Sequence, residues 1–206
     1  MNINFKVLII DNRPQRKYSS GYRISIEDIN SIEMYSKVGM VSTSIEGLRD
    51  ELSPYRLIAI HRSYLTENDY IGINDLMDYA KSEKDKYFIL FSGGITQNII
   101  SDNILYVNAG DFYSENLAEF IKKFLEGNID YPLQQFLYGN SWRLPFLLEL
   151  RQYLWLPKNP GNDKKIETVV KVLGDKYKNI SLDEINKDIK KEKLLFYSNA
   201  ENFDNQ

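Results

Sequence analysis

Residues 57–63 read Leu57-Ile58-Ala59-Ile60-His61-Arg62-Ser63, so an unbroken apolar run stops at three polar residues. The same arrangement occurs at residues 7–12, 88–94 and 105–108. Short continuous apolar runs are typical of parallel strands that are buried on both faces of a sheet. The carboxyl ends of such strands meet at one edge, where open α/β sheets bind ligands. The polar residues that follow each run are therefore candidates for a functional site.

Helical patterns separate these apolar runs. Residues 26–37 predict a helix that follows a serine cap, residues 38–42 a short second strand, and residues 44–52 another capped helix. Further amphipathic stripes begin near residues 73 and 117. Because parallel neighbours need crossover connections, the alternating order predicts an α/β fold. We expect a five-stranded doubly wound parallel sheet in the flavodoxin-like order.

The composition narrows the class of protein. The chain has 206 residues, of which 27% are charged and 43% hydrophobic, and a formal net charge of −3. These values are typical of a soluble globular protein and do not indicate a general nucleic-acid-binding surface. The chain has no cysteine, which excludes disulfides, thiolate nucleophiles and cysteine-ligated metals. Since no apolar run is long enough to span a membrane, we expect a cytoplasmic protein with no membrane partner.

The character of the sequence changes near residue 129, which predicts an α/β domain over residues 1–128 and a helical extension over residues 129–206. The apolar helix from Trp142 to Trp155 either packs as core or offers a surface for a partner chain or a second copy. A helix-turn-helix over residues 163–193 is a further alternative. Its mild excess of cations over acids makes nucleic acid an unlikely partner.

Residues 5–127 resemble the receiver domain of bacterial response regulators. Asp11 fits the acid after the first strand, Asn12 stands where a second acid often lies, and Ser92 fits the hydroxyl after the fourth strand. His61 stands where the resemblance implies a phosphate-accepting aspartate, and Asn108 where it implies a lysine. The substitutions remove a magnesium ligand and a phosphate-reading cation. They predict a pseudo-receiver that is not phosphorylated in the usual way, holds no metal or cofactor, and signals or assembles by binding a protein.

A small hydrolase or nucleotide-binding enzyme is the alternative. His61 is the only histidine and could act as a general base, with Asp11 as its orienting acid and Ser63 or Ser92 as the nucleophile. Otherwise His61 is a partly buried polar residue at a strand end.

Two features could supply ligand contacts to such an enzyme. Ser92-Gly93-Gly94 resembles the phosphate loop of ATP pyrophosphatases, although its glycines could equally serve a tight turn with positive φ. An anion-attracting rim could form from Arg13, Arg16, Lys17 and Arg62. Asn12, Ser63 and Asn108 could add further ligand contacts.

Overall fold

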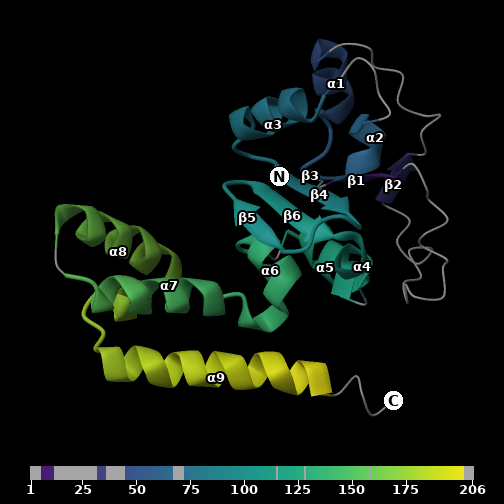
Figure 1. Ribbon diagram of the computed structural model, residues 1–206. Helices are drawn as coiled ribbons and strands as arrows, with labels where there is room; N and C mark the ends of the chain where they lie inside the picture. Colours follow the sequence, from purple (N-terminus) through teal and green to yellow (C-terminus); the bar gives the residue numbers. More distant parts are fainter. Residues whose placement is uncertain are drawn as a thin grey trace. The chain divides into compact units, whose positions relative to one another are not determined.

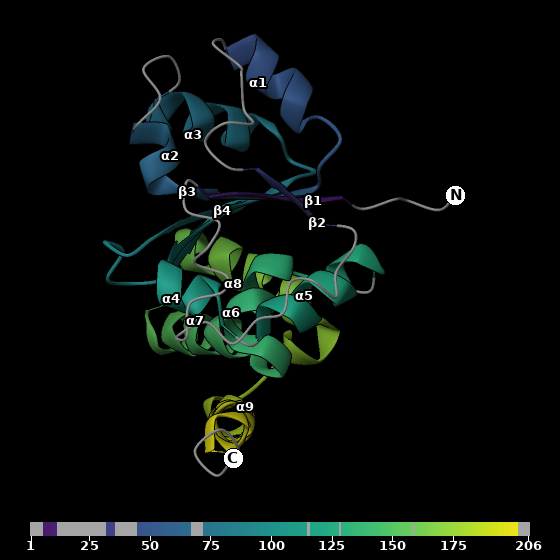
Figure 2. The same cartoon turned by 90° about the vertical axis from the view of Figure 1, so that its right-hand side faces the viewer.

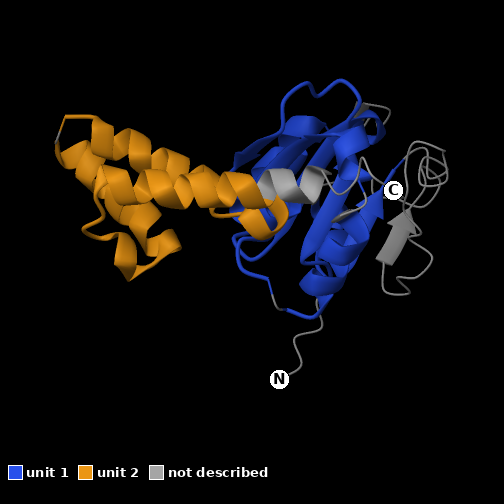
Figure 3. Ribbon diagram, turned by 90° about the horizontal axis from the view of Figure 1, so that it is seen from below, with its two compact units in different colours: residues 1–136 blue, residues 137–206 orange. Residues whose placement is uncertain are grey.

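The computed structural model describes residues 6–11, 32–35, 45–66, 72–114, 116–127, 129–157 and 159–201. The chain divides into two compact units, Met1–Phe136 and Leu137–Gln206 (Figure 3). The first unit continues past residue 128, because the Phe136 ring lies 5.1 Å from Phe120 and 6.0 Å from Phe112. The domain boundary expected after residue 128 stays a prediction.

Unit 1 is built on a six-stranded sheet in the order β2-β1-β3-β4-β6-β5. The strands are β1 (Val7–Ile10), β2 (Ile32–Tyr35), β3 (Leu57–His61), β4 (Tyr87–Ser92), β5 (Ile99–Ser101) and β6 (Ile104–Asn108). The predicted five parallel strands in flavodoxin-like order are confirmed by β2-β1-β3-β4-β6. The sequence analysis missed β5, which pairs antiparallel with β6 at the edge of the sheet.

The prediction of a helix over residues 26–37 is wrong for its described part. Residues Ile32–Tyr35 form β2, which pairs in parallel register with Val7–Ile10. Pairing with β1 overrides the local helical spacing, because a four-residue segment gains more from completing a sheet than from its weak intrinsic propensity. The expected strand at residues 38–42 lies outside the described residues, as does the loop between β1 and β2.

Helices cover both faces of this sheet (Figure 1, Figure 2). One layer holds α1 (Ile45–Leu52), α2 (Arg62–Thr66) and α3 (Ile73–Ser82), and the other holds α4 (Ala109–Phe112), α5 (Asn116–Leu125) and α6 (Pro132–Tyr138). Side chains of each strand alternate between the layers. Ile58 and Ile60 of β3 pack with Leu48 and Leu76 on the first face, so Ala59 and His61 turn to the α4–α6 face.

A buried lysine fixes the end of α1. The side chain of Lys86 is 7% exposed, and its ammonium donates to the carbonyls of Leu52 (3.2 Å), Ser53 (2.8 Å) and Tyr55 (2.7 Å). The Leu52 carbonyl ends α1 and also accepts the N–H of Tyr55 at 3.1 Å, while Ser53 and Tyr55 follow the helix, so the cation adds a charged donor to the turn that ends α1. Burial lowers the pKa of Lys86, since removal from water penalises the charged form.

Unit 2 consists mainly of three helices, α7 (Leu144–Trp155), α8 (Pro160–Leu173) and α9 (Leu182–Glu201), and α7 packs against both others. Asn159 caps α8, and Ser181 and Glu184 form a reciprocal capping box at the start of α9. The Tyr177 hydroxyl donates to Asp188 at 2.8 Å, which lowers the pKa of that carboxyl. The apolar core contains Leu144, Leu147, Leu150, Val169, Val170, Leu173, Ile185 and Ile189.

None of the described helices combines the length and the apolar character that crossing a bilayer requires.

Replacing Lys86 by methionine tests its role as a clamp. We expect Lys86→Met to lower the free energy of unfolding by about 2–4 kcal/mol, because buried carbonyls lose a charged donor. Lys84→Met changes an exposed neighbour and should cost less than about 0.5 kcal/mol. Urea denaturation of both variants measures the difference, and equal stabilities would contradict the clamp.

Candidate functional site

The structure brings the carboxyl ends of β1, β3, β4 and β6 to one edge of the sheet. Ile10 pairs with Ile60, so Asp11 and His61 occupy corresponding positions just beyond that pair. His61 pairs with Phe91, and Ser92 pairs with Asn108. The candidate residues on these four strands therefore share one edge, and their surroundings decide what they can do.

Asp11 is completely buried at this edge. The hydroxyl of Tyr113 donates a hydrogen bond of 2.7 Å to its Oδ2 atom. Tyr113 follows α4 and is itself buried, as are Phe91 and Phe112, whose rings stack at 4.0 Å. The Tyr113 ring also meets Phe91 edge to face at 5.6 Å. The carboxylate that was expected to face a ligand is thus buried and accepts a hydrogen bond from an aromatic hydroxyl.

His61 is also buried, with 4% of its surface exposed. Its ring meets Phe91 edge to face at 5.1 Å. Its Nδ1 atom accepts the backbone N–H of Ser63 at 3.2 Å and lies 2.6 Å from Ser63 Oγ. Because a backbone N–H can only donate, Nδ1 is the unprotonated nitrogen, and the proton of the neutral imidazole lies on Nε2. His61 directly precedes α2, so this bond caps the start of that helix.

The turn after β4 does not depend on its glycines. The N–H of Ile95 donates to the Ser92 carbonyl at 3.2 Å, and the N–H of Gly94 donates to Ser92 Oγ at 3.3 Å. Neither Gly93 nor Gly94 has a positive φ, which corrects the expectation of left-handed backbone. A methyl group would meet nothing within 4 Å at Gly93 and only Ser92 Oγ, at 3.9 Å, at Gly94.

Asn108 holds together the segments beside this turn. Its Oδ1 accepts the Gly110 N–H at 2.8 Å and so caps α4, while its Nδ2 donates to the Ile95 carbonyl at 2.9 Å. Its own N–H donates to Asn98 Oδ1 at 3.0 Å, and Asn98 Nδ2 donates to Asp111 at 2.9 Å. The residue in the place of the receiver lysine therefore has both side-chain groups engaged in structural hydrogen bonds.

The remaining candidate residues do not complete a reactive centre in the described structure. Arg62 is exposed on α2, and Asn12 and Arg13 lie outside the described residues. Among the residues whose placement is described, no three histidine, aspartate or glutamate side chains gather as metal ligands.

Sequence reasoning missed Tyr113 and Asn98. No motif signals either one, because their partners lie on other elements of the fold.

The expected Trp142 to Trp155 helix divides into two environments. Trp142 precedes α7, is 8% exposed, and lies 4.3 Å from the guanidinium of Arg143. Trp155 at the other end of α7 is 78% exposed. One end of this segment is therefore buried and the other is exposed, and the expected surface for a partner chain or a second copy stays a prediction.

Removing the Tyr113 hydroxyl tests how the buried carboxylate is held. We expect Tyr113→Phe to destabilise the chain by about 1–3 kcal/mol, because Asp11 loses a donor that water cannot replace. Tyr106→Phe is the matched control, since that hydroxyl contacts only the weak acceptor sulfur of Met77. Chemical denaturation that gives the same stability for the two variants would refute this assignment.

Adding a methyl group at Gly93 tests whether the turn needs glycine. We expect Gly93→Ala to be neutral or to stabilise the chain by up to about 1 kcal/mol, because φ is ordinary and the space is open. Gly174→Ala should destabilise it, since Gly174 has a φ of 103° and is equally open. Thermal unfolding compares the two, and a marked loss of stability for Gly93→Ala would contradict the prediction.

No family model and no curated protein matches the chain. A solved structure of the RcsB response regulator of Salmonella typhimurium, described for its conformational dynamism in DNA interaction, is 15% identical. That alignment covers 94% of this chain and 92% of the other, with a TM-score of 0.38. The receiver-like architecture of unit 1 rests on its own strand order.

Proposed function

We propose that this protein is a receiver-like signalling or assembly module that binds a protein partner and carries out no phosphotransfer at its sheet edge. The observation that carries the proposal is the buried hydrogen bond between Tyr113 and Asp11. A carboxylate that must hold magnesium or meet a phosphoryl donor has to reach solvent. Asp11 is instead completely buried and accepts a hydrogen bond from the hydroxyl of Tyr113.

The other positions at this edge support the same proposal. His61 gives its Nδ1 atom to the start of α2, and Asn108 gives its side chain to the start of α4. Neither has the role that the receiver resemblance implies at its position. With the chemistry absent, the fold remains useful as a rigid platform that presents other surfaces.

Protein binding is favoured by the apolar surface of unit 2. Trp155 is 78% exposed and Leu156, which follows it, is 41% exposed. Trp is enriched among the residues that dominate the binding energy of protein interfaces, and adjoining exposed apolar side chains mark such surfaces.

One contact favours the hydrolase alternative. Ser63 Oγ lies 2.6 Å from His61 Nδ1, a distance at which an imidazole could take the hydroxyl proton. Nδ1 also accepts the Ser63 backbone N–H, however, so the pair is a local turn between residues i and i+2. Asp11, the expected orienting acid, receives its hydrogen bond from Tyr113.

Incubation with acetyl phosphate and magnesium tests the proposed function. We expect no phosphoryl group on the chain, because neither Asp11 nor His61 is accessible to the donor. Intact-mass measurement detects the modification, and an unrelated, phosphorylatable receiver domain serves as positive control. A phosphoryl group that His61→Ala or Asp11→Asn removes would overturn the proposal.

A further inference from the structure

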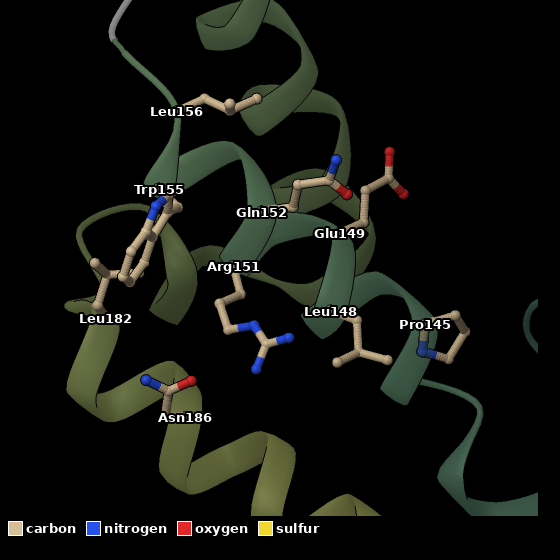
Figure 4. Close-up of a pocket in the computed structure, with 9 residues that line it drawn as sticks. All are labelled: Pro145, Leu148, Glu149, Arg151, Gln152, Trp155, Leu156, Leu182 and Asn186. Carbon is tan, nitrogen blue, oxygen red and sulfur yellow. The ribbon is translucent and has the colours of Figure 1, made fainter.

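Unit 2 carries an open groove between α7 and the beginning of α9 (Figure 4). Leu148, Arg151 and Trp155 line it from α7, at spacings of three and four residues that place them on one helix face. Leu182 and Asn186 line it from α9 with the same periodicity. The groove has a volume of about 890 Å³ and is further bordered by Pro145, Glu149, Gln152 and Leu156.

The groove has apolar walls and two charged side chains, Arg151 and Glu149, beside the amides of Gln152 and Asn186. Leu148, Trp155 and Leu182 supply apolar walls, and the guanidinium of Arg151 lies among them (Figure 4). Arg151 is exposed and makes no ion pair with any residue that the structure describes. Glu149, the acid nearest in sequence, accepts a hydrogen bond of 2.6 Å from the Tyr153 hydroxyl. The surface therefore fits a ligand that has apolar side chains beside a negative charge.

We propose that this groove binds an amphipathic helix with acidic flanks from a different protein. The inference rests on the proposed function and names the chemistry of the partner. From Leu148 to Trp155 is seven residues, or about 10 Å along α7, which matches two turns of a docked helix. Such helices insert apolar residues at positions i, i+3 or i+4, and i+7. A glutamate or aspartate beside those anchors would pair with Arg151.

Charge favours a different protein over a second copy of this chain. The exposed apolar residues described on α9 are Leu194, which is 62% exposed, and Leu195, which is 43% exposed. Lys190 and Lys191 precede Leu194 by four and three residues and therefore share its helix face, and Lys193 adjoins it. Docking that segment beside Arg151 would bring like charges together in a partly desolvated groove.

Binding of designed peptides to the full chain tests the inference. The probe is a labelled synthetic helix of about four turns with leucines at i, i+3, i+4 and i+7 and glutamates on both flanks. A peptide with lysines in place of the glutamates and a scrambled peptide are its controls. Fluorescence anisotropy should show micromolar affinity for the acidic helix and binding at least tenfold weaker for the others.

Matched variants of the chain locate the binding. Trp155→Ala should weaken binding about 30-fold, as removal of a dominant interface residue does. Arg151→Glu should reverse the preference, so that the lysine-flanked helix binds better than the glutamate-flanked one. Leu194→Ala and Lys171→Glu change an exposed apolar residue and an exposed charge elsewhere in unit 2, and both should leave the affinity unchanged.

Three outcomes would overturn this assignment. The first is that the acidic helix does not bind. The second is that Arg151→Glu leaves the charge preference unchanged. The third is that sedimentation shows a dimer, which Trp155→Ala dissociates. Each would leave the proposed absence of phosphotransfer intact. Phosphorylation at the sheet edge would instead overturn the proposed function without changing the affinities of these peptides.

Discussion

The proposed function of this sheet edge depends on the hydrogen bond between Tyr113 and Asp11. This bond joins residues 102 positions apart, both almost completely buried. A buried carboxylate is costly unless donors satisfy it, and Tyr113 supplies one of them, so the contact stabilises Asp11 and the segment that carries Tyr113 together. Phe112 and Tyr113 of that segment lie against Phe91, at the end of the sheet where open α/β folds hold ligands. Buried aromatic side chains therefore pack together at this end of the sheet.

His61 and Asn108, the two residues that depart from the receiver pattern, have the same structural role. His61 and Asn108 each end a strand and each cap the helix that follows at once, α2 and α4 respectively. A cap of this kind stabilises a helix by about 1 kcal/mol, and both helices are short enough to need it. These two residues lie at the strand ends where reactive side chains are expected, and their side chains cap helices there. Unit 2 presents an exposed indole, Trp155, and an exposed cation, Arg151, on one face of α7.

Much of the fold could be predicted because continuous apolar runs specify buried parallel strands directly. Strand β2 could not be predicted, because Ile32–Tyr35 becomes a strand only by pairing with β1. Strand β5 could not be predicted either, because its three residues are too few to show a pattern. The candidate residues at the sheet edge could be located from their strands, but their burial could not, because Tyr113 reaches Asp11 only through the placement of α4. His61 lies two residues before Ser63 at the start of a helix, and this spacing is a sequence sign of capping. Arg151 lies between Leu148 and Trp155 on one helix face, and this spacing is a sequence sign of a charge within an apolar surface.

The reactivity of His61 towards diethyl pyrocarbonate tests the closed sheet edge most directly. The chain has a single histidine, so the modification reports on this one imidazole. If the buried aromatic side chains close the edge, the native chain should react many times more slowly than the chain unfolded in urea, and Tyr113→Phe should speed the native reaction. Native and unfolded chains that react at the same rate would contradict a closed edge and restore it as a site for chemistry.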